Sequence, residues 1–189
     1  MTNVFLEGTT LLFNKPLAWT SADITRKVHS VLKRHYQIKK IKVGHAGTLD
    51  PMATGLVIVC TGMHTKTIDS IQSQEKEYIA VLKLGETTPS FDLETNVDFQ
   101  FEISHINEDF INQVLKGFVG KQKQIPPQYS AKRIDGKRAY EFARKGETVE
   151  LKLADIEIYN LEILEFELPK LKIKINCSKG TYIRSLARD

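Results

Sequence analysis

The most constraining pattern in the sequence is the strict alternation of apolar and polar residues from Leu171 to Cys177. Successive side chains of a strand point to opposite faces, so this alternation predicts a half-buried β-strand. The segment 77–84 has the same period of two. The segment 21–36 has apolar residues at helical spacing, and Ser21 is expected to cap that helix. Because strands and helices alternate without a regular βαβ rhythm, the sequence predicts an α+β fold.

Several shorter elements are expected on both sides of these segments. A glycine-rich loop around Gly44 and Gly47 leads into one of them. The expected strands are 11–13, 56–60, 156–158 and 163–168, with one helix capped by Asn107 and another beginning near Thr181. In the helix after Asn107, the residues expected to point inward are Phe110, Ile111, Val114, Leu115 and Phe118.

The size of the chain limits it to one core, or to one core with a small appendage. It has 189 residues, of which 41% are hydrophobic and 26% charged. The stretch 124–152 is different in character, because it contains Pro126-Pro127, is basic and has few large aliphatic residues. We therefore expect a single domain over residues 1–189, with an insertion at about 124–152 that projects from the core.

Composition also argues against several classes of protein. The longest apolar runs, such as 55–60, are too short to span a bilayer, and the N-terminus has no signal-peptide layout. Cys60 and Cys177 form no CxxC pair, so buried, inert thiols in a reducing cytoplasm are expected. No metal-ligand spacing, Walker motif or dinucleotide-binding glycine pattern is present, so neither a metal nor a nucleotide cofactor is implied.

Charge is distributed unevenly along the chain. Lys and Arg number 27 against 23 Asp and Glu, a formal net charge of +4. Such an asymmetry fits a protein with one face turned toward nucleic acid, and it equally fits an ordinary solvated surface. The basic residues gather between Lys33 and Lys42 and again at Lys121, Lys123, Lys132, Arg133, Lys137, Arg138, Arg144 and Lys145.

Asp50 is a candidate nucleophile. Pro51 restricts it to an extended conformation, which limits the direction of its carboxylate. Asp-Pro is also a common turn signal, and for an isolated dipeptide this is the more frequent meaning. Gly44 and Gly47 favour a functional role, because glycine allows a backbone to approach another molecule closely.

Three further residues could act with Asp50. Arg184 falls in the first turn of the expected last helix, where a cation opposes the helix dipole, so a specific anionic partner is indicated. Asp50 could be that partner, and the pairing would keep the nucleophile ionised; the alternative is a surface salt bridge. Tyr78 is either a core aromatic or a ring that stacks on a base, and His45 either wedges beside nucleotides or has no special role.

Four segments in this order and spacing closely resemble the TruB family of bacterial tRNA pseudouridine synthases. The segment 44–55, Gly-His-Ala-Gly-Thr-Leu-Asp-Pro-Met-Ala-Thr-Gly, is similar to the family's catalytic motif. The other three are residues 11–16 with Thr20-Ser21, residues 126–131 through 136–141, and residues 177–186.

The resemblance implies the pseudouridine synthase fold, with a mixed, mainly antiparallel sheet flanked by helices and an RNA-binding thumb at the insertion. It also implies isomerisation of uridine 55 in the tRNA T-loop to pseudouridine, without metal or cofactor. The uridine would flip out of its stack, and the nucleophile would attack either uracil C6 or ribose C1′. The expected partner is the T-arm of tRNA, bound by a monomer that needs no protein partner.

The same resemblance assigns roles to individual residues. Asp50 matches the nucleophilic aspartate, Tyr78 the tyrosine beside the target base, and Arg184 the arginine that pairs with the catalytic carboxylate. Besides Tyr78, the residues expected to bind substrate are His45, Tyr182 and Lys15. The expected RNA contacts of the thumb are Lys132, Arg133, Lys137, Arg138 and Arg144.

Two features depart from the family pattern. Ala18 stands where the first motif usually has glycine, a change expected only to adjust a loop. The chain also ends at Asp189, just inside the last expected helix, so we expect a catalytic domain incomplete at its C-terminal side, without the small C-terminal RNA-binding domain.

Two alternatives to a tRNA isomerase are considered. One is a non-catalytic RNA-binding module, favoured by the intact thumb and the early end of the chain. The other is a synthase that acts within a guide-RNA complex, against which the bacterial-like thumb sequence argues.

Overall fold

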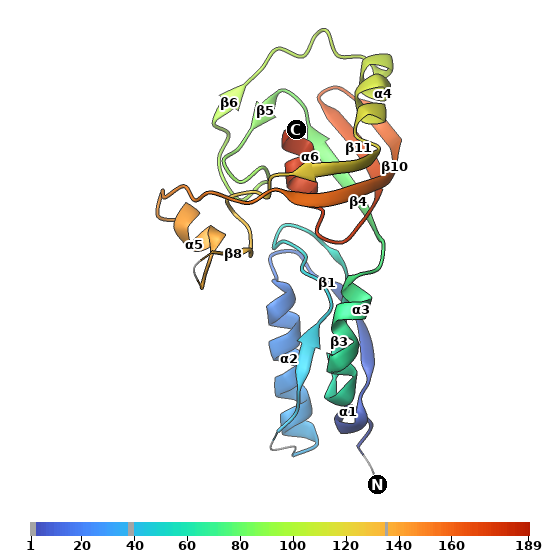
Figure 1. Ribbon diagram of the computed structural model, residues 1–189, viewed down its shortest axis with the longest axis vertical. Helices are drawn as coiled ribbons and strands as arrows, with labels where there is room; N and C mark the ends of the chain where they lie inside the picture. Colours follow the sequence, from blue (N-terminus) through green and yellow to red (C-terminus); the bar gives the residue numbers. More distant parts are fainter. Residues whose placement is uncertain (1–2, 38–39, 135) are drawn as a thin grey trace. The chain divides into compact units, whose positions relative to one another are not determined.

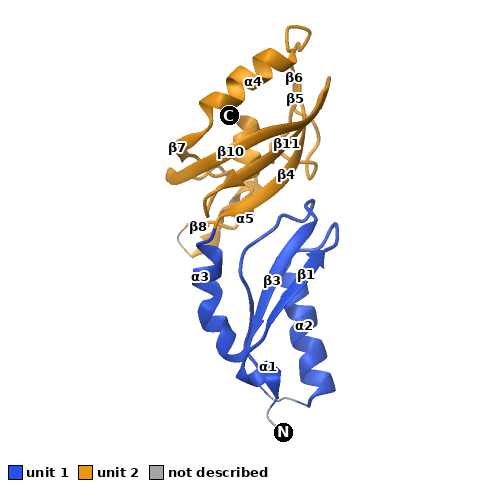
Figure 2. Cartoon of the chain, turned by 90° about the vertical axis from the view of Figure 1, so that its right-hand side faces the viewer, with its two compact units in different colours: residues 1–74 blue, residues 75–189 orange. Residues whose placement is uncertain are grey.

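The computed structural model describes residues 3–37, 40–134 and 136–189. The chain divides into two compact units, residues 1–74 (unit 1) and 75–189 (unit 2), shown in Figure 2. Each unit contains its own cluster of buried apolar residues. The sequence indicated one core, whereas the structure has one buried cluster on a three-stranded sheet and another on a four-stranded sheet.

Unit 1 is a three-stranded antiparallel sheet with a long helix on one face (Figure 1). Its strands are β1 (Thr10–Lys15), β2 (Val43–His45) and β3 (Gly55–Thr61), in the order β1-β3-β2. Helix α2 (Ser21–His35) contributes Ile24, Val28 and Leu32 to the core, where they meet Val57 and Val59 of β3. Of the apolar stripe predicted for this helix, these three residues are buried, while Val31 and Tyr36 are 51% and 46% exposed.

The capping residue of α2 differs from the one expected. Thr20, not Ser21, is the N-cap: its hydroxyl accepts a hydrogen bond from the Asp23 amide, and the Asp23 carboxylate accepts one from the Thr20 amide. This reciprocal capping box occupies the first turn of the helix. Ser21 is released from capping and is instead buried, at 1% exposure.

The remaining elements of unit 1 are short. They are α1 (Val4–Glu7), the 3-10 helix η1 (Gly62–Thr67) and α3 (Ile68–Gln72). Gly44 and His45, expected in a loop, form β2 by pairing with Cys60 and Val59 of β3. A Cβ on Gly44 would come within 2.7 Å of the Ile68 side chain, so this glycine permits close packing onto α3.

Unit 2 is built on a four-stranded antiparallel sheet. Its strands are β4 (Lys76–Lys83), β7 (Gly120–Gln124), β10 (Ala154–Glu167) and β11 (Lys170–Cys177), in the order β4-β11-β10-β7. The two strands expected at 156–158 and 163–168 are one long strand, β10, in which the register shifts twice. The α+β class and the mainly antiparallel pairing are confirmed.

Two helices contribute to the core of unit 2. Ile111 of α4 (Glu108–Gly117) and Leu186 of α6 (Ile183–Arg188) belong to one buried cluster with the alternating residues of β11. Asn107 caps α4 as expected, by accepting a hydrogen bond from the Phe110 amide at 2.9 Å. Phe110 and Val114 were expected to point inward but are 44% and 39% exposed, because only the Ile111 side of this helix faces the sheet.

The rest of unit 2 consists of short ladders and turns. Strands β5 (Glu86–Thr87) and β6 (Phe99–Gln100) pair with each other. Within the stretch expected to be an insertion, β8 (Arg133–Ile134) pairs with β9 (Lys137–Arg138), and α5 (Ala139–Ala143) follows directly. This small hairpin and helix belong to the segment expected to form the thumb.

Both cysteines are fully buried, as expected. Burial raises the pKa of the Cys177 thiol, which disfavours the reactive thiolate. In the part of the chain that the structure describes, the helices are all too short or too polar to cross a bilayer.

The capping box of α2 predicts a specific pH dependence. Hydrogen bonds from the Thr20 side chain and backbone and from Arg26 lower the pKa of Asp23 from 3.8 to about 2. A carboxyl whose pKa is depressed on folding adds stability above its unfolded pKa and loses it as pH falls through the folded value. In urea unfolding, the stability advantage of the wild type over Asp23→Asn should therefore shrink between pH 4 and pH 2. Parallel stability curves over this range would contradict the assignment.

Candidate functional site

Asp50 lies in the loop between β2 and β3 of unit 1 and is half-buried. The loop is fixed on both sides of this residue. On one side, the Leu49 amide donates to the buried Ser21 hydroxyl at 3.0 Å. On the other, the Pro51 carbonyl accepts from the Ala18 amide at 2.9 Å and from Lys15 Nζ at 3.3 Å. The backbone that carries the candidate nucleophile is thus held in one conformation.

Lys15, at the end of β1, lies inside the protein. Its side chain is fully buried, and its ammonium donates to the carbonyls of Pro16 (3.0 Å), Trp19 (2.5 Å) and Pro51 (3.3 Å). Burial lowers the pKa of Lys15, while the nearby charges of Asp50 and Asp23 act in the opposite direction. The substrate contact expected for Lys15 is therefore corrected: an ammonium whose donors are directed at three backbone carbonyls supports the loop from within.

Ala18 adopts a left-handed backbone conformation, with φ of 64°. This is the position at which the family's first motif usually has glycine, and glycine adopts such values without the steric cost that a Cβ imposes. The alanine therefore adopts a backbone conformation that suits glycine, with local strain.

His45 is the last residue of β2 and directly precedes the loop that carries Asp50. Its Nδ1 is 2.5 Å from the Gly47 carbonyl, which orients the ring. The residue borders a surface hollow. The hollow is also lined by residues of β2 and α2, namely Ala22, Thr25, Arg26, His29, Val43 and Gly44.

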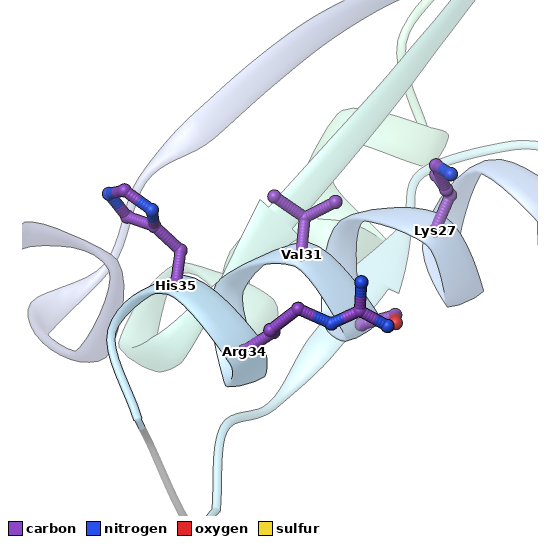
Figure 3. A pocket seen from close by; sticks show the side chains of 5 residues that line it. Lys27, Val31, Arg34 and His35 are labelled. Atoms are coloured by element: carbon purple, nitrogen blue, oxygen red, sulfur yellow. The ribbon is translucent and has the colours of Figure 1, made fainter.

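A second hollow follows α2 toward its C-terminal end. Figure 3 shows Lys27, Val31, Arg34 and His35 along its wall, and Ser30 completes the lining. Within the described residues, no ion pair neutralises Lys27 or Arg34. This face of unit 1 therefore offers positive charge to a polyanion.

In unit 2, the guanidinium of Arg184 is tightly held. It donates to the carbonyls of Ser90 at 3.0 Å and Tyr129 at 2.9 Å, and its Nη1 is 3.4 Å from Asp92 Oδ2. The side chains of Arg184 and Asp92 are only 11% and 12% exposed, so the pair is shielded from solvent. Arg184 is the second residue of α6, as the sequence predicted.

Asp92 was not singled out from the sequence. Its Oδ1 accepts from the Ser90 hydroxyl at 2.6 Å and from the Glu94 amide at 2.9 Å, which leaves Oδ2 toward Arg184. The preceding residue, Phe91, has φ of 56°, a strained value for a bulky side chain. A lone carboxylate in a Thr-Pro-Ser loop gives no local signal of such a role, because its partner lies more than 90 residues away.

Tyr78 and Tyr182 also belong to unit 2. Tyr78 lies on β4 opposite Ile175 and packs against the buried cluster, so its ring is partly a core aromatic, one of the two alternatives considered. Tyr182 is the residue directly before α6 and has an extended backbone. Both backbone polar groups of Tyr182 are bound by the side chain of Gln124.

The five cationic residues expected to bind RNA divide into two groups. Arg133, Lys137 and Arg144 are exposed, and the last two lie over the rings of Phe142 and Tyr140. Lys132 and Arg138 are half-buried and donate to the carbonyls of Lys152 and Ala131. The first group presents its charges outward, while the second also stabilises the segment itself.

No group of three or more His, Cys, Asp or Glu side chains suited to a metal ion occurs among the described residues. The candidate residues fall in both units: His45 and Asp50 in unit 1, and Tyr78, Tyr182 and Arg184 in unit 2.

The contact between Ser21 and Leu49 predicts a measurable effect on stability. In Ser21→Ala, a partly buried amide loses its acceptor, so the free energy of unfolding should fall by about 1–2 kcal/mol. Chemical denaturation measures this change. The control is Ser30→Ala, the same substitution at an exposed position of the same helix. If the two variants are equally stable, the contact does not support the loop.

Comparison with known proteins relates this arrangement to one family. Residues 33–183 match the TruB family pseudouridylate synthase, N-terminal domain. The chain is 60% identical over 185 residues to tRNA pseudouridine synthase B of Parabacteroides distasonis and 54% identical to that of Phocaeicola vulgatus. Each alignment covers 98% of this chain and 79% of the relative.

Solved structures agree in fold. A chain of a Cbf5-Nop10-Gar1 complex superposes with a TM-score of 0.68 at 27% identity, over 97% of this chain and 43% of that one. A chain from an H/ACA RNP bound to a substrate RNA containing 2′-deoxyuridine gives 0.62 at 24% identity, over 97% and 41%. This chain spans less than half the length of either. On the extent of the family match and the identity to its relatives, the chain belongs to the TruB family of pseudouridylate synthases, which are isomerases.

Proposed function

We propose that this protein converts uridine 55 in the T-loop of tRNA to pseudouridine, with Asp50 as the nucleophile and without metal or cofactor. The observation that carries the proposal is the segment 44–55, in which the backbone of Asp50 is held from both sides. The names of the curated relatives support tRNA as the substrate.

The proposed reaction leaves the composition of the nucleotide unchanged, although the hydrogen lost from C5 goes to solvent. The bond from ribose C1′ to uracil N1 breaks, and a bond from C1′ to C5 forms. The proton leaves C5 and N1 gains one, so the product is an isomer. A carboxylate that attacks uracil C6 or ribose C1′ keeps the base in the site while it rotates. Asp50 must be ionised for either attack.

Arg184 and Tyr78 complete the proposed chemistry. Arg184 carries a permanent positive charge, and two carbonyls and Asp92 limit its motion. Such a preoriented cation stabilises a carboxylate nucleophile and the negative charge that develops during reaction. Tyr78 is proposed to stack beside the target base and, through its hydroxyl, to help move the C5 proton.

Substrate binding is proposed to rely on shape and on phosphate contacts. The uridine must leave its stack before the glycosidic bond is accessible. His45 would occupy the space it leaves, Tyr182 would contact the nucleotide, and the cationic residues of the thumb would bind phosphates of the T-arm. We propose a cytoplasmic monomer that needs no protein partner, although one structural relative was solved in a complex with Nop10 and Gar1.

A nucleophilic role for Asp50 predicts that turnover is lost when its carboxylate is replaced. The protein, expressed from its complete reading frame, should release tritium from a tRNA transcript labelled at uracil C5, and Asp50→Asn should release none above background. The amide is close in shape but is a far weaker nucleophile than the carboxylate. A transcript with cytidine at position 55 should release no label.

Two results would count against the proposal. Release from the cytidine-55 transcript equal to that from the wild-type transcript would contradict the site of action. Binding of T-arm RNA by the wild type with no release of label would favour a non-catalytic RNA-binding module.

Asp92 is predicted to support turnover through the negative charge it places beside Arg184. Asp92→Asn removes the negative charge beside Arg184 and keeps the shape of the side chain. Removing one partner of a shielded ion pair leaves the other charge unbalanced, so kcat should fall by roughly 10- to 100-fold, with KM little changed. Steady-state tritium release from an excess of tRNA measures kcat, and Asp109→Asn on the exposed face of α4 is the charge-matched control. Wild-type kcat in Asp92→Asn would show that the pair is dispensable.

A further inference from the structure

Gln124, the last residue of β7, has its carboxamide inside unit 2. The residue is only 3% exposed, and β7 lies at the edge of the four-stranded sheet. A buried amide is costly unless its oxygen and nitrogen are both hydrogen-bonded. The identity of its partners therefore indicates what this residue does.

Both partners belong to a single residue, Tyr182. Gln124 Nε2 donates to the Tyr182 carbonyl at 3.1 Å, and Gln124 Oε1 accepts from the Tyr182 amide at 2.9 Å. The side-chain amide thus binds the peptide groups of Tyr182 as a neighbouring strand would. Tyr182 is extended, with φ of −100° and ψ of 112°, and its own side chain makes no capping hydrogen bond.

Tyr182, held in this way, directly precedes α6. A helix of six residues is not stable by itself, so its position depends on the contacts at its ends. Ile125, the residue directly after β7, adds two contacts to α6. Its carbonyl accepts from the Ser185 hydroxyl at 2.8 Å and from Arg188 at 3.3 Å. Arg184 lies two residues after Tyr182, so the position of its backbone depends on how Gln124 holds Tyr182.

We propose that Gln124 is a positioning residue for the reaction: it acts through the backbone of Tyr182 to set the Tyr182 ring and the Arg184 guanidinium. The inference rests on the proposed function and adds a residue to its machinery. Gln124 itself touches neither substrate nor reacting atoms in this account.

The two hydrogen bonds require the donor and acceptor that a glutamine amide provides. Glutamate has the same shape, but an ionised carboxylate would place an acceptor against the Tyr182 carbonyl. Once protonated, the carboxylic acid can donate to that carbonyl while it accepts from the Tyr182 amide, so it restores both bonds. Methionine is similar in length and provides neither bond.

The experiment compares kcat of the wild type, Gln124→Glu and Gln124→Met between pH 5.5 and 8 by steady-state tritium release from an excess of tRNA. Gln124→Met should lose about 10- to 100-fold in kcat at every pH, while the Kd for tRNA changes less than threefold. Gln124→Glu should lose as much at pH 8 and recover toward the wild type as pH falls.

The matched control is Gln122→Glu, on the same strand. The Gln122 amide also donates to a carbonyl, that of Phe118 at 2.6 Å, but Phe118 directly follows α4 and is remote in sequence from α6. Its kcat should stay near that of the wild type and show no recovery at low pH. A loss in Gln124→Glu that is independent of pH, or that Gln122→Glu shares, would overturn the proposal.

Hydrogen exchange of the free protein tests the contact without any turnover. Gln124→Met should exchange at least tenfold faster than the wild type in the peptide 182–188, and Gln122→Met should not. Unchanged exchange there, or faster exchange with unchanged kcat, overturns the positioning role. If Gln124→Glu fails to fold, Gln124→Met still decides the matter. A wild type without turnover refutes the proposed function, and the exchange result still tests the contact separately.

Discussion

The loop that carries Asp50 depends on one buried cation. Lys15 Nζ donates to the carbonyls of Pro16 and Trp19, before α2, and to that of Pro51, which follows the candidate nucleophile and is 36 residues from Lys15. Burying an ammonium is costly, so the fold retains it only where carbonyl dipoles and nearby carboxylates replace water. Asp50 and Asp23 supply that negative charge. The stability of unit 1 and the geometry of its candidate nucleophile are therefore coupled through the same side chain.

Unit 2 fixes its candidate catalytic cation by a related arrangement. The Arg184 guanidinium is bound by carbonyls of two loops, at Ser90 and Tyr129, and is partly balanced by one carboxylate, Asp92. A group fixed in this way needs little reorganisation during reaction, which is the condition under which electrostatic stabilisation is most effective. It also makes the cation sensitive to residues that never approach the substrate, since any change in the loops or in the start of α6 moves it.

Local sequence patterns predicted the helices and strands, but they did not predict most of the hydrogen bonds that fix Lys15 and Arg184. Periodicity indicated α2, β4 and β11 correctly, because an apolar stripe must face a core wherever the helix or strand lies. Periodicity alone does not choose between Ser21 and Thr20 as the cap of α2. The local signal that does is the capping box, Thr20 with Asp23 three residues later, while Ser21 is bound by the tertiary contact with Leu49. The substrate contact expected for Lys15 came from the family resemblance, and local sequence could not place the Trp19 and Pro51 carbonyls around its ammonium.

Candidate site residues were predictable where a motif surrounds them, as for Asp50 and Arg184, and not where the partner is distant, as for Asp92 and Gln124. Ala18 shows how strongly such distant contacts act. It keeps a left-handed φ of 64°, which costs an L-residue about 1–2 kcal/mol, while its amide donates to the Pro51 carbonyl. If residue preference determined the loop, alanine would relax to a negative φ. The strain persists because the hydrogen bonds to Pro51 determine the backbone, and the residue conforms to the loop that holds Asp50.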